Sequence, residues 1–145
     1  MPAAEVDPVE MVDALAAFLA ALHLPAALAA RPWVGDPVWV HGDLHPANVL
    51  VEAGRLSGVI DFGDLTGGDP ATDLSVIWMV LPPSEHQRFW TSYAASVAHC
   101  VDADLRARAR GWASALAVVF LAHSADNPLM GGIGRRTMTA LLEEQ

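Results

Sequence analysis

Polar side chains that could carry out acid–base and metal chemistry gather in one stretch near the middle of the chain. Asp43 lies two residues after His41, and Asn48 follows five residues later. A further carboxylate, Asp61, comes thirteen residues after Asn48. A carboxylate can orient and deprotonate an attacking hydroxyl, whereas amide and carboxylate oxygens are hard ligands that suit Mg²⁺. These residue types could therefore supply a base and metal ligands.

These residues fit two motifs whose combination is far more specific than either motif alone. Residues 41–48 have the spacing H-x-D-x-x-x-x-N, and residues 61–63 read Asp-Phe-Gly. A predicted hairpin separates the two motifs, and a predicted strand precedes the first. The pair resembles the catalytic loop and metal loop of the kinase-like phosphotransferases, in which a base activates a hydroxyl and a bound metal holds the nucleotide phosphates.

Two segments narrow the resemblance to one family. Residues 41–48 read HGDLHPAN and residues 67–74 read GGDPATDL, and both closely resemble the aminoglycoside phosphotransferase family, which includes choline- and homoserine-kinase-like enzymes. In that family a glycine and a histidine replace the arginine and lysine of the protein-kinase catalytic loop. This chain has Gly42 and His45 at those positions. The resemblance extends from Val38 to the last helix, although only its first half is motif-specific.

The resemblance implies a role for each of these side chains. Asp43 would be the catalytic aspartate, and Asn48 and Asp61 would hold Mg²⁺. The ATP-binding residues would be His45, Asn48 and Asp61. Asp73 would brace the catalytic loop by hydrogen bonds. The complete enzyme would transfer the γ-phosphoryl group of ATP or GTP to a hydroxyl of a small molecule such as an aminoglycoside, which links the family to antibiotic resistance.

A competing interpretation treats the same residues as a metal centre. His41, Asp43 and His45 alternate along the chain, so on an extended backbone their side chains would project to one side, with Asp61 as a fourth ligand. That set would suit a metal-dependent hydrolase. Pro46 and the lack of any further cluster of His and Asp count against it, and it leaves the Asp-Phe-Gly motif unexplained.

The fold implied by the resemblance is α+β. It is a mainly helical C-terminal lobe of the protein-kinase-like fold, with a small β-hairpin module that carries the catalytic and metal loops. β-branched runs around a glycine-containing turn predict the hairpin, and a glycine-rich loop follows it at Phe62–Gly68. The predicted strands are Val38–Val40, Asn48–Glu52 and Leu56–Asp61, with the turn at Ala53–Arg55.

Apolar spacing and end signals predict helices on both sides of this module. An N-terminal helix should run from about Pro8 to Leu22, and the connector His23–Pro37 should hold one helical turn at Ala26–Ala30. Ser84–Gln87 reads as a capping box. The remaining predicted helices are Pro70–Leu81, Ser84–His99, Asp102–Ala122 and Ile133–Leu142.

Composition bounds the class of protein. The chain has 145 residues, of which 53% are hydrophobic, and we expect a single domain over residues 1–145. The formal net charge of −9 argues against nucleic-acid binding, because that needs a basic face. Cys100 is the single cysteine, so no internal disulfide can form, and no uncharged stretch reaches membrane-spanning length. We therefore expect a cytoplasmic protein without a membrane span.

All eight basic residues are arginine, and the chain has no lysine. Enzymes of the resembled family carry an N-terminal ATP-binding lobe with a lysine that pairs with the nucleotide phosphates. Only about forty residues precede the catalytic loop, so we expect this lobe to be absent and the isolated chain to have little or no kinase activity. The alternative is a non-catalytic remnant or interaction module. In either case the exposed inter-lobe face should favour self-association.

Overall fold

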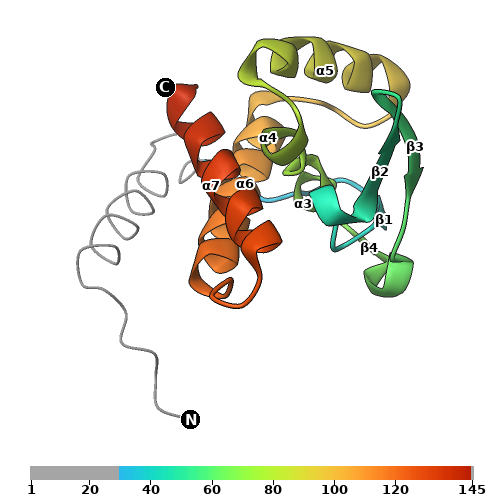
Figure 1. Cartoon of the computed structure of the whole chain (residues 1–145). Coiled ribbons are helices and arrows are strands. Elements are labelled where there is room, and N and C mark those ends of the chain that lie inside the picture. Colours follow the sequence, from blue (N-terminus) through green and yellow to red (C-terminus); the bar gives the residue numbers. More distant parts are fainter. Residues whose placement is uncertain (1–29, 145) are drawn as a thin grey trace.

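The computed structural model describes residues 30–144. The predicted helix Pro8–Leu22 and nearly all of the turn expected at Ala26–Ala30 lie outside the described residues. Helices make up most of the described part, and small antiparallel sheets stand at one side of them (Figure 1). This mixture of helices and small sheets agrees with the predicted α+β class.

Four short strands form two separate antiparallel pairs. Strand β1 (Val38–Val40) pairs with β4 (Thr66–Gly68), and β2 (Val49–Glu52) pairs with β3 (Arg55–Val59). Ala53 and Gly54 connect β2 to β3 with φ angles of 49° and 74°. Positive φ at both central residues is the turn that suits the right-handed twist of a hairpin, and the predicted hairpin is confirmed.

The predicted glycine-rich loop at Phe62–Gly68 is partly wrong. It contains a 3₁₀ turn, η2 (Phe62–Asp64), and then strand β4. Glycine disfavours strands when judged alone. Here Gly67 and Gly68 take the partners Trp39 and Val38 across the sheet, and this antiparallel pairing places both glycines in a strand.

The predicted helix Pro70–Leu81 is interrupted. Two short helices, α3 (Ala71–Leu74) and α4 (Ile77–Val80), replace it. At the break, Ser75 Oγ donates to Thr72 O at 2.7 Å, a local bond that competes with helical pairing. The end is as predicted, because Leu81 is extended before Pro82.

Three longer helices complete the body, namely α5 (Pro83–Ser96), α6 (Ala103–Ala122) and α7 (Pro128–Glu143). The predicted helix Asp102–Ala122 is confirmed as α6, and Asp102 caps it, since Asp102 Oδ1 accepts from Leu105 N at 2.8 Å. The predicted capping box at the start of α5 does not form. Pro83 occupies the first helical position, so Ser84 lies inside the first turn instead of capping it.

Helix α7 begins at Pro128, before the predicted start at Ile133. The prediction missed this start because three glycines weaken the helical signal of the sequence there. One of them, Gly134, lets α7 approach α6 closely. A Cβ at Gly134 would lie 3.0 Å from Ala117 O and 3.0 Å from Leu121 Cγ. The core of the described part therefore lies between these two helices and the neighbouring α3 to α5. Its buried side chains include Leu74, Ile77, Trp78, Trp90, Leu105, Ile133 and Leu141.

Within residues 30–144, no helix is both long and apolar enough to cross a membrane.

Candidate active site

The segment predicted as the catalytic loop, residues 41–48, contains a glycine that no other residue could replace without strain. Gly42 has φ +86°, and a Cβ there would lie 2.5 Å from the backbone oxygen of Asp64. The loop that precedes Asp43 therefore packs directly against the turn η2, which follows Asp61. This close approach brings the two predicted motifs together.

The ring of His41 connects the same two segments through its two nitrogen atoms. Its Nε2 lies 2.8 Å from Ile60 O, and its Nδ1 accepts from Asp43 N at 3.4 Å. A carbonyl partner at one nitrogen and an amide donor at the other assign the proton to Nε2. The buried ring also packs on Phe62, with 4.7 Å between ring centroids.

This use of both ring nitrogens argues against the hydrolase interpretation. A metal-binding histidine needs a free ring nitrogen, and His41 has none. Within residues 30–144, no three His, Cys, Asp or Glu side chains lie together as a metal-holding group. The proposed set of His41, Asp43, His45 and Asp61 is therefore not assembled as a ligand cluster.

Asp73 holds the backbone at the start of the catalytic loop. Its Oδ2 accepts from His41 N at 2.6 Å, and its Oδ1 accepts from Gly42 N at 3.0 Å. Hydrogen bonds to a charged acceptor are stronger than those between neutral groups. Asp73 therefore makes the bracing contacts that the resemblance implied.

Asp43 and His45 lie next to each other in the loop. The Asp43 side chain is 48% exposed, and its Oδ2 is 3.5 Å from His45 Nε2. Ala47 N donates to His45 Nδ1 at 3.3 Å, which leaves the proton on the Nε2 that faces Asp43. The His45 ring rests edge-on against Phe120 of α6, with 5.8 Å between centroids. The carboxylate is thus accessible and has an N–H beside it.

Asn48 connects the catalytic loop to the hairpin. Its buried side chain donates from Nδ2 to Asp43 O at 2.9 Å, and its backbone oxygen accepts from Ile60 N at 3.0 Å. This second bond extends the β2–β3 register, so Asn48 and Asp61 lie at the same end of the hairpin. Among residues 30–144, no donor is bonded to Asn48 Oδ1.

Asp61 occupies a strained backbone position. Its φ and ψ are 64° and 62°, in the left-handed region that few residues other than glycine adopt. Its side chain is exposed and has no hydrogen-bond partner within the described part of the chain. Strain of this kind costs about 1–3 kcal/mol and collects at functional sites. The amide oxygen of Asn48 and the carboxylate of Asp61 form a donor set of the chemistry that Mg²⁺ prefers.

The sequence missed Ile60 as part of the site. It acts through its backbone, by accepting from His41 and donating to Asn48. A backbone role leaves no trace in the residue type, so no sequence signal could have revealed it.

Comparisons with known proteins identify the family of the chain. The model of the phosphotransferase enzyme family matches residues 3–117. Aminoglycoside 3'-phosphotransferases of Streptomyces fradiae and Escherichia coli are 41% and 37% identical over 66 and 65 residues, which is 44% and 43% of this chain. Uncharacterized protein YcbJ of Bacillus subtilis (strain 168) is 32% identical over 62 residues, or 42% of the chain.

These matched segments cover 25%, 24% and 20% of the respective relatives, so the chain aligns with only a part of each. No solved structure matches. The family model nevertheless extends well over half of the chain and includes both motifs of the site. The chain therefore belongs to the phosphotransferase enzyme family.

Proposed function

We propose that this chain supplies the base and the metal ligands of an ATP-dependent phosphotransferase that acts on a hydroxyl of a small molecule such as an aminoglycoside. The supporting observation is the link between Asn48 and its neighbours. The side chain of Asn48 is bonded to Asp43, and its backbone oxygen is bonded to Ile60. The base and the residue before Asp61 are therefore both held by Asn48. ATP supply makes the cytoplasm the compartment for this reaction.

In this proposal Asp43 is the general base. Its exposed carboxylate accepts the proton of the substrate hydroxyl as that oxygen attacks the γ-phosphorus, and ADP leaves with the electron pair of the broken P–O bond. The N–H of His45 restrains Oδ2. Asp73 and Gly42 keep the preceding backbone in one conformation. Such positioning is the main contribution a protein makes to phosphoryl transfer.

Asn48 Oδ1 and the Asp61 carboxylate are the proposed Mg²⁺ ligands. The bond from Asn48 Nδ2 to Asp43 O fixes the amide so that its oxygen is the atom left for a ligand. When bound, Mg²⁺ neutralises charge on the transferring phosphates of ATP. Asp61 needs no reorganisation to receive the ion, since its side chain is already exposed and without a hydrogen bond within residues 30–144.

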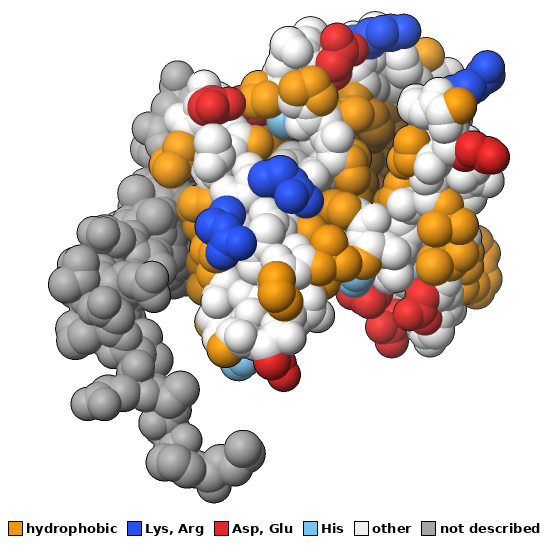
Figure 2. Space-filling model, in the orientation of Figure 1, with side chains coloured by type: hydrophobic (Ala, Val, Ile, Leu, Met, Phe, Trp, Pro, Cys, Tyr) orange, Lys and Arg blue, Asp and Glu red, His pale blue; other side chains and the backbone are white. Residues whose placement is uncertain are grey.

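The phosphates also need a cation that this chain supplies only as arginine, because it has no lysine. A lobe that covers the nucleotide, as the resemblance implies, would pack on an apolar surface. The four strands and the loops between them, residues 38–68, form what we call the strand module. This module exposes such a surface, seen at the right of Figure 2, and we call it the strand-module face. Its exposed side chains are Trp39, Leu50, Val51, Leu56, Ile60, Phe62 and Leu65.

The strand-module face also favours a second candidate function. Exposed apolar patches mark interaction sites, so a non-catalytic interaction module would display the same surface. In both cases we expect the uncovered surface to associate with a second copy of the chain. The two candidates differ in whether the site turns over substrate.

Metal binding by the chain itself tests the proposed ligands. Mn²⁺, a paramagnetic substitute for Mg²⁺, should broaden the NMR signals of Asn48 and Gly63, because Asn48 is a proposed ligand and Gly63 lies beside Asp61, the other one. Asp61→Asn should abolish this broadening. Asp126→Asn, which removes an exposed carboxylate from a loop between α6 and α7, should leave it unchanged. Equal broadening in the wild-type chain and the Asp61 variant would refute the metal site.

Turnover is the second measurement. ATP consumption with a panel of aminoglycosides and other alcohols should be low for the isolated chain, because losing a charge-stabilising group costs roughly 10²–10³ in rate. Any consumption that remains should disappear in Asp43→Asn. Rapid turnover that requires Asp43 would show that no further lobe is needed, and consumption that persists in Asp43→Asn would exclude Asp43 as the base.

A further inference from the structure

The bracing of the catalytic loop depends on a helix too short to fix its own position. Asp73, which accepts from His41 N and Gly42 N, lies on the four-residue helix α3. Helices of this length are not stable without outside contacts. Some other group must therefore determine where the carboxylate of Asp73 lies.

Arg108 of α6 provides such a contact at the start of α3. Its Nε donates to Asp69 Oδ2 at 2.8 Å, and its Nη2 lies 3.5 Å from Asp69 Oδ1. The same Asp69 Oδ1 accepts from Ala71 N, the first residue of α3, at 3.0 Å. The Arg108 and Asp69 side chains are only 15% and 22% exposed, so solvent screens this pair weakly.

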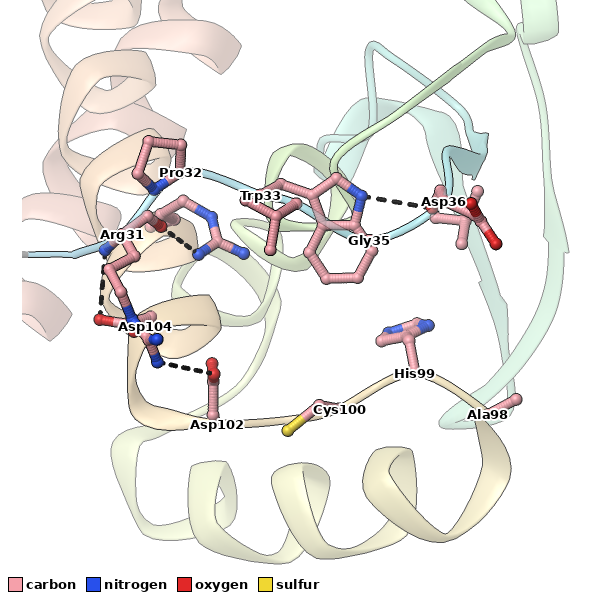
Figure 3. A pocket seen from close by; sticks show the side chains of 13 residues that line it. Arg31, Pro32, Trp33, Gly35, Asp36, Ala98, His99, Cys100, Asp102 and Asp104 are labelled. Atoms are coloured by element: carbon pink, nitrogen blue, oxygen red, sulfur yellow. Dashed lines mark hydrogen bonds and ion pairs between the residues drawn. The ribbon is translucent and has the colours of Figure 1, made fainter.

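Arg108 is itself held from the opposite side. Its Nη1 donates to Arg31 O at 2.6 Å, and its guanidinium lies 5.7 Å from the centroid of the Trp33 ring. Arg31 in turn donates from Nε to Asp104 Oδ2 at 2.6 Å, beside a cavity of about 800 Å³ (Figure 3). All three guanidinium nitrogens of Arg108 are engaged, and the planar fork of arginine allows this where a lysine could not.

We propose that Arg108 is a positioning residue for Asp43, acting through Asp69 and Asp73. The inference rests on the proposed function, in which Asp43 is the base. The route has three steps: Arg108 fixes Asp69, Asp69 fixes the start of α3, and Asp73 on α3 holds the two amides that precede Asp43. Nothing in the two motifs of the site points to Arg108, which lies 65 residues after Asp43.

The test is NMR of the His41 and Gly42 amides in the chain carrying Arg108→Ala. Loss of the route should move both amide protons upfield and accelerate their exchange with solvent by about tenfold or more, the size expected for a weakened bond to a charged acceptor. The matched control is Arg106→Ala on the same helix, whose guanidinium lies over Trp90 and not on Asp69. If the two variants change these amides equally, the proposal is wrong.

A milder variant covers the case in which Arg108→Ala does not fold. Arg108→Lys keeps the charge and loses the fork, so it should give a smaller shift at the same two amides. No change in Arg108→Lys would contradict the proposal. Combining Arg108→Ala or Arg108→Lys with Asp69→Asn should add little to either single effect, whereas fully additive effects would exclude the route through Asp69.

These measurements need neither nucleotide nor substrate. Manganese broadening that does not depend on Asp61 would refute the proposed metal site and leave the amide result standing. Unchanged amides in a chain that shows the Asp61-dependent broadening would refute the role of Arg108 alone.

Discussion

The helical body and the strand module are held in different ways. In the body, side chains such as Ile133 and Leu141 are fully buried between helices. In the strand module, Trp39 is 78% exposed and Leu56 is 68% exposed. The proposed chemistry lies on the exposed module, and a few polar bonds and one glycine position it. Packing therefore stabilises this protein in one region, while hydrogen bonds determine the geometry of the site in another.

The largest expected difference between the two regions is in the free energy of unfolding that a leucine-to-alanine substitution removes. Leu141→Ala should lower the free energy of unfolding by about 3–5 kcal/mol, because it leaves a cavity in the core. Leu56→Ala on β3 should change it by less than about 0.5 kcal/mol, because the side chain is already in water. Urea unfolding followed by circular dichroism measures both. Similar losses for the two variants would show that the strand module packs more tightly than its exposure indicates.

Two glycines of the strand module provide the next comparison. Gly42→Ala should cost about 2–3 kcal/mol, because the new Cβ adds a clash with Asp64 O to the strain of positive φ. Gly54→Ala has a similar φ of 74° but open space around it, so it should cost only about 1 kcal/mol. Unfolding free energies from urea titration test this order. Equal costs for the two variants would mean that the loop at Gly42 and the turn at Asp64 move apart at no cost in free energy.

Self-association should depend on the strand-module face. Replacing Trp39 and Leu56 by serine should raise the dissociation constant of self-association at least about tenfold, because aromatic and large apolar side chains dominate interface energies. Leu129→Ser, at an exposed leucine of α7, is the control and should have little effect. Sedimentation equilibrium measures the constants. A wild-type chain that stays monomeric at high concentration would contradict this prediction.

The smallest effect concerns an exposed ion pair. Hydrogen bonds from Arg31 lower the pKa of Asp104 below its ordinary value. A carboxyl with a lowered pKa in the folded state stabilises the fold above its unfolded pKa, and this contribution disappears as the pH falls through the folded value. The urea midpoint of wild type should therefore exceed that of Asp104→Asn slightly near neutral pH, and the difference should vanish in acid or in high salt. A difference that grows in acid would contradict the assigned sign.

The sequence predicted those features that depend on residue type and spacing. Turn residues revealed the hairpin, and the predicted helix Asp102–Ala122 agrees with α6 to within one residue. Family resemblance identified Asp73 as the brace of the catalytic loop, and its two hydrogen bonds are present. The catalytic and metal-binding roles of Asp43, His45, Asn48 and Asp61 remain predictions.

Features that depend on tertiary contacts could not be predicted. Strand β4 exists because β1 offers its glycines a partner, and the close packing of α7 on α6 depends on the missing side chain of Gly134. The pairing of Asp69 with Arg108 joins residues 39 positions apart. Sequence periodicity reports on neighbours within one element, so it says nothing about such pairs.

The left-handed backbone at Asp61 has a genetic consequence. Asparagine and aspartate both tolerate this conformation better than other residues with a Cβ, and their codons differ by a single base. One point mutation can therefore remove the charge of Asp61 while the loop keeps its shape. Under the proposed function, a single nucleotide change at this position would therefore separate a metal-binding chain from a folded chain that binds no metal.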